Sequence, residues 1–124
     1  MIKAWFFAYP ELNKTIELAK KVEELNYDYI LLPFNSDMPD PLSKSLLIFQ
    51  NTKKIKCWVA LPGYAATATY INMMFKTIKE VFPDRFLAIN IIDGGMQEDP
   101  VKFGIVKNKE IIKNINKKFV EKIK

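Results

Sequence analysis

The stretch from Arg85 to Gly95, RFLAINIIDGG, contains the side chains best suited to hold a small ligand. It is a nearly continuous apolar run, interrupted by Asn90 and ended by Asp93-Gly94-Gly95. Such a run is typical of a strand that is buried on both faces, as parallel strands under helices are. A buried amide needs a hydrogen-bond partner, because leaving it unpaired is costly, and two glycines let a ligand approach the backbone closely. The stretch therefore indicates a ligand contact, with a bond from Asn90 to neighbouring backbone as the alternative.

Other catalytic and metal-binding patterns are weak in this sequence. It contains no histidine and one cysteine, so the usual spacing of metal ligands is absent. Asp37 and Asp40 lie in a polar loop, where aspartates are more often solvated than paired for acid–base catalysis. Asp93-Gly94-Gly95 lacks the lysine and hydroxyl residue of a phosphate-binding loop. Cys57 lies in an apolar run and is predicted to be a small buried hydrophobe.

Strand and helix patterns alternate along most of the chain. Short apolar or aromatic runs predict strands at Ile2–Tyr9, Tyr27–Pro33, Ile55–Leu61 and Phe86–Ile92. Apolar residues spaced by three or four predict helices at Glu11–Asn26, at Pro41–Thr52 and from Thr67 or Thr69 to Val81. A last amphipathic helix is predicted within residues 107–123, from Lys109 to Ile123. Such alternation implies an α/β fold with a parallel sheet and right-handed crossovers.

The ends of the four predicted strands carry residues that can shape a binding site. In a parallel sheet the loops after the strands share one edge, and ligands bind at that edge. These loops begin with Tyr9-Pro10, Pro33-Phe34-Asn35, Pro62-Gly63 and Asp93-Gly94-Gly95. The alternative is that the prolines and glycines only terminate the strands. We expect the candidate site at this edge.

Composition indicates a single globular domain over residues 1–124. The chain is 49% hydrophobic and 27% charged, enough for a modest core. The net charge of +5 comes almost wholly from lysine, with Arg85 the sole arginine, and does not by itself indicate a nucleic-acid partner. A single cysteine excludes an internal disulfide and fits a reducing, cytoplasmic location. No run approaches the roughly twenty apolar residues that a membrane helix needs.

Five segments occur in an order and at a spacing typical of one known family. They are Trp5-Phe6-Phe7, LNYDYILLP, KIKCWVALPG, a helix followed by a breaker and Arg85, and Asn90-Ile91-Ile92-Asp93-Gly94-Gly95. Over about residues 3–95 the chain resembles the bacterial luciferase-like flavin monooxygenases, and within them the alkanesulfonate monooxygenases most closely. The resemblance implies a TIM-barrel fold, FMN that is reduced by a separate reductase, and use of oxygen on an aldehyde or a sulfonate. Whether the flavin is FMN or a deazaflavin-type cofactor stays open.

The resemblance also implies roles for particular residues. The predicted flavin-binding residues are Leu61, Pro62, Gly63, Asn90, Asp93 and Gly94, at the ends of the third and fourth strands. The predicted substrate-pocket residues are Trp5, Phe6 and Met38. A flavin ring needs apolar walls and a few hydrogen-bonding groups, which these residues can supply. For Trp5 and Phe6 the alternative is a role in the barrel core.

The resemblance covers the first half of a barrel only. A complete eight-stranded barrel takes about 250 residues, and the family's histidine and most of its phosphate-binding residues lie in its second half. Four strands leave inner faces and edges uncovered. We expect a second copy, or a partner chain with the second half, to cover them, and the last helix to take the place of the family's fourth helix rather than act as a lid. The chain is then either a short FMN-dependent monooxygenase or an inactive half-barrel that serves as a binding or assembly module.

Overall fold

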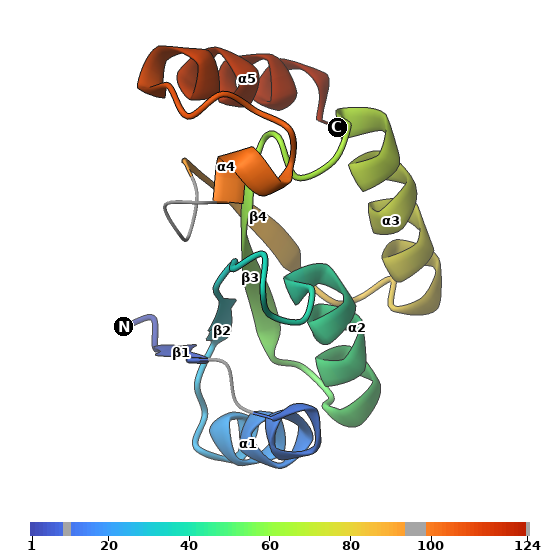
Figure 1. The fold of residues 1–124 in the computed structure, drawn as a ribbon. Helices are drawn as coiled ribbons and strands as arrows, with labels where there is room; N and C mark the ends of the chain where they lie inside the picture. The colour runs from blue at the N-terminus through green and yellow to red at the C-terminus, as the bar shows by residue number, and fades with distance from the viewer. Residues whose placement is uncertain (9–10, 94–98, 124) are drawn as a thin grey trace.

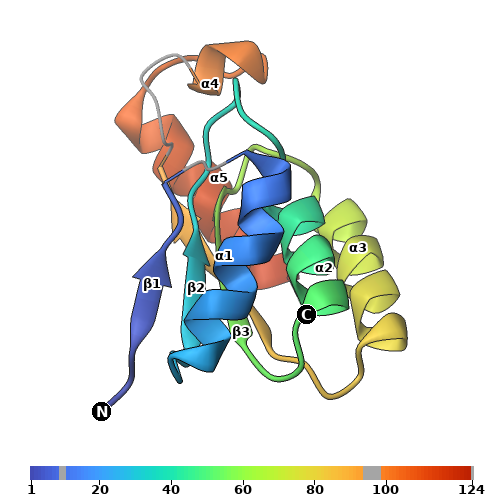
Figure 2. The same ribbon diagram turned by 90° about the horizontal axis from the view of Figure 1, so that it is seen from below.

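The computed structural model describes residues 1–8, 11–93 and 99–123, which form one parallel sheet with helices on one side (Figures 1 and 2). The strands are β1 (Ala4–Phe6), β2 (Tyr29–Leu32), β3 (Lys56–Pro62) and β4 (Leu87–Ile92), and they neighbour one another in chain order. The helices are α1 (Leu12–Glu24), α2 (Pro41–Asn51), α3 (Ala68–Val81), α4 (Asp99–Lys102) and α5 (Lys109–Lys122). This arrangement is the predicted α/β fold, a parallel (β/α)4 half of a TIM-barrel-like architecture.

The helix boundaries follow from local capping. Asp40 begins α2, because its carboxylate accepts hydrogen bonds from the first-turn backbone, and Pro41 fits the first helical position. The Thr67 hydroxyl caps α3 in the same way, so Thr67 rather than Thr69 begins that helix. Asn26 has a φ of 63°, in the left-handed region that ends helices, and it follows Leu25, the C-cap of α1.

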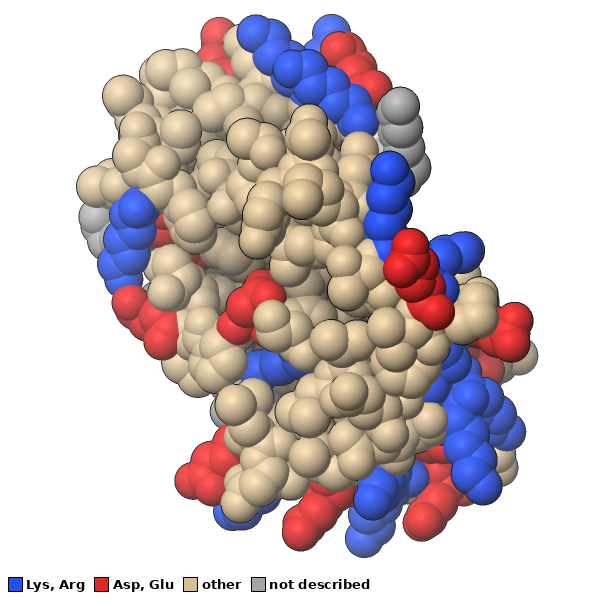
Figure 3. Space-filling view, turned by 90° about the vertical axis from the view of Figure 1, so that its right-hand side faces the viewer, with Lys and Arg blue, Asp and Glu red and all other residues tan. Residues whose placement is uncertain are grey.

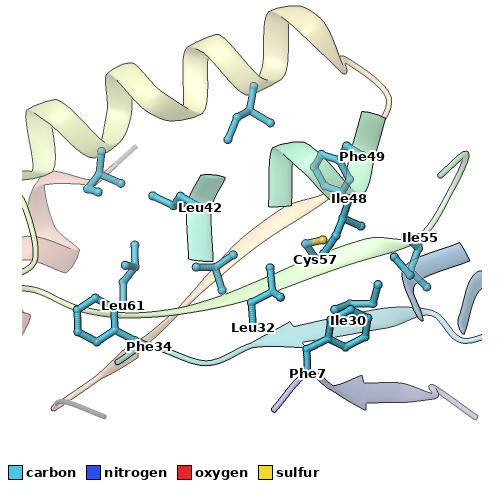
Figure 4. Close-up of a cluster of buried hydrophobic side chains, with 14 of the residues drawn as sticks. Phe7, Ile30, Leu32, Phe34, Leu42, Ile48, Phe49, Ile55, Cys57 and Leu61 are labelled. Atoms are coloured by element: carbon cyan, nitrogen blue, oxygen red, sulfur yellow. The ribbon is translucent and has the colours of Figure 1, made fainter. Parts of the chain in front are cut away.

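The strands present alternate side chains to two different faces. On β3, Cys57, Val59 and Leu61 point to the helices and are buried, whereas Lys56 and Trp58 point to the opposite face, called here the inner face. The helix-facing side chains form the core, shown between the strands and α2 in Figure 4. Cys57 is a buried hydrophobe as predicted, and burial raises the pKa of its thiol to about 12.

The prediction that Phe86–Ile92 is buried on both faces is wrong. β4 is only partly buried along its length, and Asn90 is exposed. The reason is that the described residues place helices on one side of the sheet only, which leaves Phe6, Trp58 and Phe86 on the inner face with 56%, 42% and 49% of their surface exposed. The burial cost expected for the Asn90 amide therefore does not arise on this open face.

The last helix packs against α3, and whether it corresponds to the fourth helix of the resembled family stays a prediction. α5 lies against α3, where the Asn72 side chain donates to the Lys122 carbonyl over 3.4 Å and Phe119 joins the main core. Figure 1 shows α5 beside the end of α3 and away from the inner face. Among the described residues, α5 does not lie across the inner face and so does not act as a lid. No helix within the described ranges is long and apolar enough to cross a membrane.

Glu23 ties the end of α1 to the turn before β3. Its carboxylate accepts the backbone N–H groups of Lys53, Lys54 and Ile55 over 2.8–3.1 Å. Burial raises the pKa of Glu23, but these hydrogen bonds and the nearby Arg85 outweigh burial and lower the pKa below the ordinary value.

We expect this carboxylate to make stability depend on pH. Because the folded pKa is lowered, the stabilisation is present above the unfolded pKa and is lost as pH falls through the folded one. The difference in unfolding free energy between the wild type and Glu23→Gln should therefore shrink as pH falls below the ordinary glutamate value of 4.5. Urea unfolding at several pH values measures it, with the exposed neighbour Glu24→Gln as control. A difference that stays constant with pH would contradict the assignment.

Candidate functional site

A hollow of about 590 Å³ lies on the inner face at the carboxyl ends of β2, β3 and β4. Apolar side chains form most of its wall, among them Phe6, Leu31 and Trp58. Two amides, Asn35 and Asn90, add hydrogen-bonding groups to the wall. An apolar concavity with a few placed polar groups is the usual form of a small-molecule site. Its position is the sheet edge that the sequence predicts for ligand binding.

The parallel register explains how this wall is built. Trp58 pairs with Leu31 on one side and Ala88 on the other, so all three point to the inner face. One step further along, Ala60 pairs with Asn90. The small alanine leaves space beside the Asn90 side chain, and no described group forms a hydrogen bond with that side chain. The Asn90 amide is therefore open to a ligand in the hollow.

A hydrogen-bond network fixes the edge next to the hollow. Asn116 of α5 accepts the Gly63 N–H at Oδ1 over 2.7 Å. Its Nδ2 donates to the Ile92 carbonyl over 3.2 Å and to Asp93 Oδ1 over 3.1 Å. The Tyr64 hydroxyl donates to the Asp93 carbonyl over 3.1 Å. Burial, with the charges of Asp99 and Asp93, raises the pKa of Tyr64 to about 12, so it stays a donor at neutral pH.

The loop after β2 is joined to α4 across the same edge. The backbone N–H of Ser36 donates to Asp99 Oδ1 over 3.2 Å, and Asp37 forms an ion pair with Lys102. Asp40 acts separately as the cap of α2. Asp37 and Asp40 therefore have different partners and do not form a carboxylate pair. Among the described residues, no group of three or more His, Cys, Asp or Glu side chains could hold a metal ion.

The structure brings some of the sequence-predicted residues together at the hollow. Phe6 and Asn90 line it directly. Pro62 is buried at the end of β3 and pairs with Ile92, and Ile92 lines the hollow. Asp93 is exposed just beyond β4 and is held by Asn116.

Other predicted residues lie elsewhere. Leu61 belongs to the helix-facing core, and Gly63 is buried beneath α5, where an added Cβ would lie 2.6 Å from Asn116 Oδ1. Trp5 pairs with Ile30 on the helix-facing side, with its ring 5.3 Å from that of Tyr27. The structure thus does not bring these three residues to the hollow. Met38 lies exposed in the loop after β2, and Gly94 lies outside the described residues.

Sequence reasoning missed several lining residues and the network residue. Leu31, Trp58 and Ala60 line the hollow, and the alternation of side chains along β2 and β3 was the signal that could have found them. Asn116 was missed because it lies in a helix without any motif. Its spacing from the buried Ile112 places it on the apolar side of α5, where a polar side chain needs partners.

A larger hollow, of about 890 Å³, lies beside α3, at the amino end of β4 and next to the end of α5. Its wall includes Lys76, Lys79 and Lys122, and it contains none of the residues at the carboxyl ends of the strands. Figure 3 shows the helix side of the molecule, where charged side chains gather around the margins of a largely uncharged centre. The smaller hollow is the better candidate, because it lies at the sheet edge and holds an open amide.

Comparison with known proteins gives a fold but no close relative. No protein-family model matches the sequence, and no curated protein matches it. A solved structure, described as a type II Baeyer-Villiger monooxygenase, is similar with a TM-score of 0.83 and 14% sequence identity. It is the oxygenating constituent of 3,6-diketocamphane monooxygenase from the CAM plasmid of Pseudomonas putida, in complex with FMN. The match covers 97% of this chain but 37% of that one, so this chain has the fold of part of that longer chain, which fits the half of a TIM-barrel-like architecture described above.

Proposed function

We propose that this chain provides part of the flavin site of a luciferase-like, FMN-dependent monooxygenase. The observation that carries the proposal is the inner-face hollow with the open Asn90 amide at the carboxyl ends of the strands. A fold shared with an FMN-bound monooxygenase supports it. Reduced FMN, when bound, would activate oxygen for attack on a small organic substrate, such as an aldehyde or an alkanesulfonate. A separate flavin reductase would deliver the reduced cofactor.

The lining residues suit a flavin ring. Trp58 and Leu31 offer apolar surface to the flat ring, and Phe6 closes the side toward β1. The Asn90 amide can both donate and accept, as the polar edge of the ring requires. Asp93 adds an oriented acceptor at the edge, because Asn116 and Tyr64 hold it in place. In this proposal the protein binds and orients the ring, and the apolar wall excludes water from it.

The phosphate of FMN would need groups that this hollow does not hold. No lysine or arginine is among the described residues that line it. A phosphate is normally bound by cationic side chains or by exposed N–H groups. The site is therefore proposed to be completed by a second copy of the chain or by a partner chain that carries the second half of the barrel.

We expect Asn90→Ala to weaken the binding of reduced FMN by about fivefold, because one hydrogen bond to the ring is worth about 1 kcal/mol. Anaerobic titration of the purified chain with photoreduced FMN, followed by flavin absorbance, measures the dissociation constant. Asn114→Ala, on the exposed side of α5, is the matched control and should bind as the wild type does.

Two outcomes would count against the flavin proposal. Equal affinity of Asn90→Ala and wild type would place the flavin away from this hollow. No saturable binding up to several hundred micromolar would instead favour the second candidate, a catalytically inactive half-barrel that serves as a binding or assembly module. The exposed inner face is the observation that favours this second candidate.

A further inference from the structure

The inner face is a binding surface in its own right, independent of any flavin. It exposes Phe6, Trp58 and Phe86, and β1 and β4 each have one unpaired edge in the sheet of the described residues. Exposed aromatic side chains beside unpaired parallel strands are costly in water and attract further strands. If the inner face is self-complementary, it would bind a second copy of this chain. If it is not, it needs a partner of different sequence. The residues of the inner face distinguish these two cases.

Charge argues against a second copy. Two half-barrels related by a two-fold axis would form eight strands, in which each β3 lies opposite its own copy across the barrel axis. Lys56 points inward from β3, with its Nζ 5.3 Å from the Tyr29 ring and 5.9 Å from the Phe86 ring. The two Lys56 side chains would then face each other. No aspartate or glutamate occupies an inward-pointing position of the four strands, so two like charges would meet at the amino end of the barrel without a counter-ion from these strands.

Side-chain volume argues the same way. The interior of an eight-stranded barrel is filled by about three layers of four side chains, which are mostly Val, Ile and Leu. One copy of this chain already brings four aromatic side chains to the inner face, namely Phe6, Tyr29, Trp58 and Phe86. A second copy would double that set, and overpacking of this kind is destabilising.

We propose that the inner face and the edges of β1 and β4 bind a β/α half of different sequence. Its inward-pointing side chains are mainly small or aliphatic, and one of them is a carboxylate that lies opposite Lys56. The fold match is consistent with this occupant, because this chain corresponds to 37% of a longer chain with the same fold. Pairing such a carboxylate with Lys56 removes the charge penalty, and smaller side chains leave room for Trp58.

A designed complement provides the test. It is this same chain with Lys56→Glu, Trp58→Val and Phe86→Ala, which supplies the carboxylate and the space. Both it and its partner carry Trp5→Phe, so that Trp58 of the unaltered inner face is the sole tryptophan in the mixture. Sedimentation velocity gives the stoichiometry, and the emission maximum of Trp58 reports its burial. We expect each chain alone to be a monomer, and the mixture to form a 1:1 complex with a blue-shifted Trp58.

The matched control moves the charge change away from the interface. It keeps Trp58→Val and Phe86→Ala but replaces Lys56→Glu with Lys117→Glu on the exposed side of α5. We expect it to bind the unaltered chain about tenfold or more weakly than the complement does. Lys56→Glu alone, which leaves the aromatic residues intact, is a second variant in case the triple variant does not fold. Its affinity for the unaltered chain should exceed its affinity for a second copy of the same variant.

Two results would overturn the proposal. The first is a stable homodimer of the unaltered chain in which Trp58 is buried. The second is pairing of the complement that is no tighter than pairing of the control. Neither measurement involves flavin, so failure here would leave the proposed flavin site untouched.

Discussion

Arg85→Met is expected to lower the free energy of unfolding by about 2–4 kcal/mol. The guanidinium donates from Nη1 to the carbonyls of Phe49 and Thr52 over 3.1 and 3.0 Å. From Nη2 it donates to Thr52 Oγ1 over 2.7 Å and to the Ile55 carbonyl over 2.8 Å. It also stacks on the Phe49 ring, 4.4 Å from the ring centre. Methionine fills much of the volume but leaves these acceptors without their donor.

The geometry makes the expected loss specific to arginine. Arg85 joins the end of α2 to the turn before β3 from its own position before β4, and only a planar fork can reach all these acceptors at once. Arg85→Lys should therefore lower the free energy of unfolding by more than half as much as Arg85→Met does, although it keeps the charge. Urea unfolding measures both variants, with the exposed Lys79→Met as control, which should change stability by less than about 0.5 kcal/mol. A loss below about 1 kcal/mol for Arg85→Met would contradict this expectation, because it would show that water satisfies the same acceptors with little loss of stability.

The helices and the order of the strands could be predicted from the sequence because their signals are local. Asp40-Pro41 and Thr67 define helix starts by their own chemistry, and the observed starts of α2 and α3 agree. The strands are less well defined, since a strand ends where its neighbour ends. The prediction Ile2–Tyr9 becomes β1 at Ala4–Phe6, which pairs with β2 over three residues.

The candidate site could be predicted only in part, because the direction of each side chain depends on register. Asn90 and Phe6 reach the hollow, whereas Leu61, which the resemblance placed at the flavin, points to the helices with Ile91. Because side chains alternate along β3, Leu61 and its neighbour Ala60 point to opposite faces. This difference in direction could be predicted from the sequence. The partners of Arg85 come from two segments that only the folded chain brings together, and no local pattern could give them.

We expect Asn116→Leu to lower the free energy of unfolding by about 2–4 kcal/mol and to loosen the edge of the candidate site. Leucine fills the volume but leaves the Gly63 N–H and the Ile92 carbonyl without their side-chain partner, and buried groups in this state cost about 1–3 kcal/mol each. The same change frees the Asp93 carboxylate, which Asn116 now holds. Asn114→Leu, exposed on the same helix, is the matched control for the loss of an asparagine.

Hydrogen exchange distinguishes the two parts of this expectation. The Gly63 amide should exchange slowly in the wild type and in Asn114→Leu, because the buried Gly63 N–H donates a hydrogen bond to Asn116. In Asn116→Leu it should exchange much faster than the amides of the central strand β3, which keep their partners. If Gly63 and β3 instead gain exchange rate together, the variant has lost global stability only. A selective gain at Gly63 would identify Asn116 as the residue by which α5 holds the end of β3, and with it the edge of the hollow.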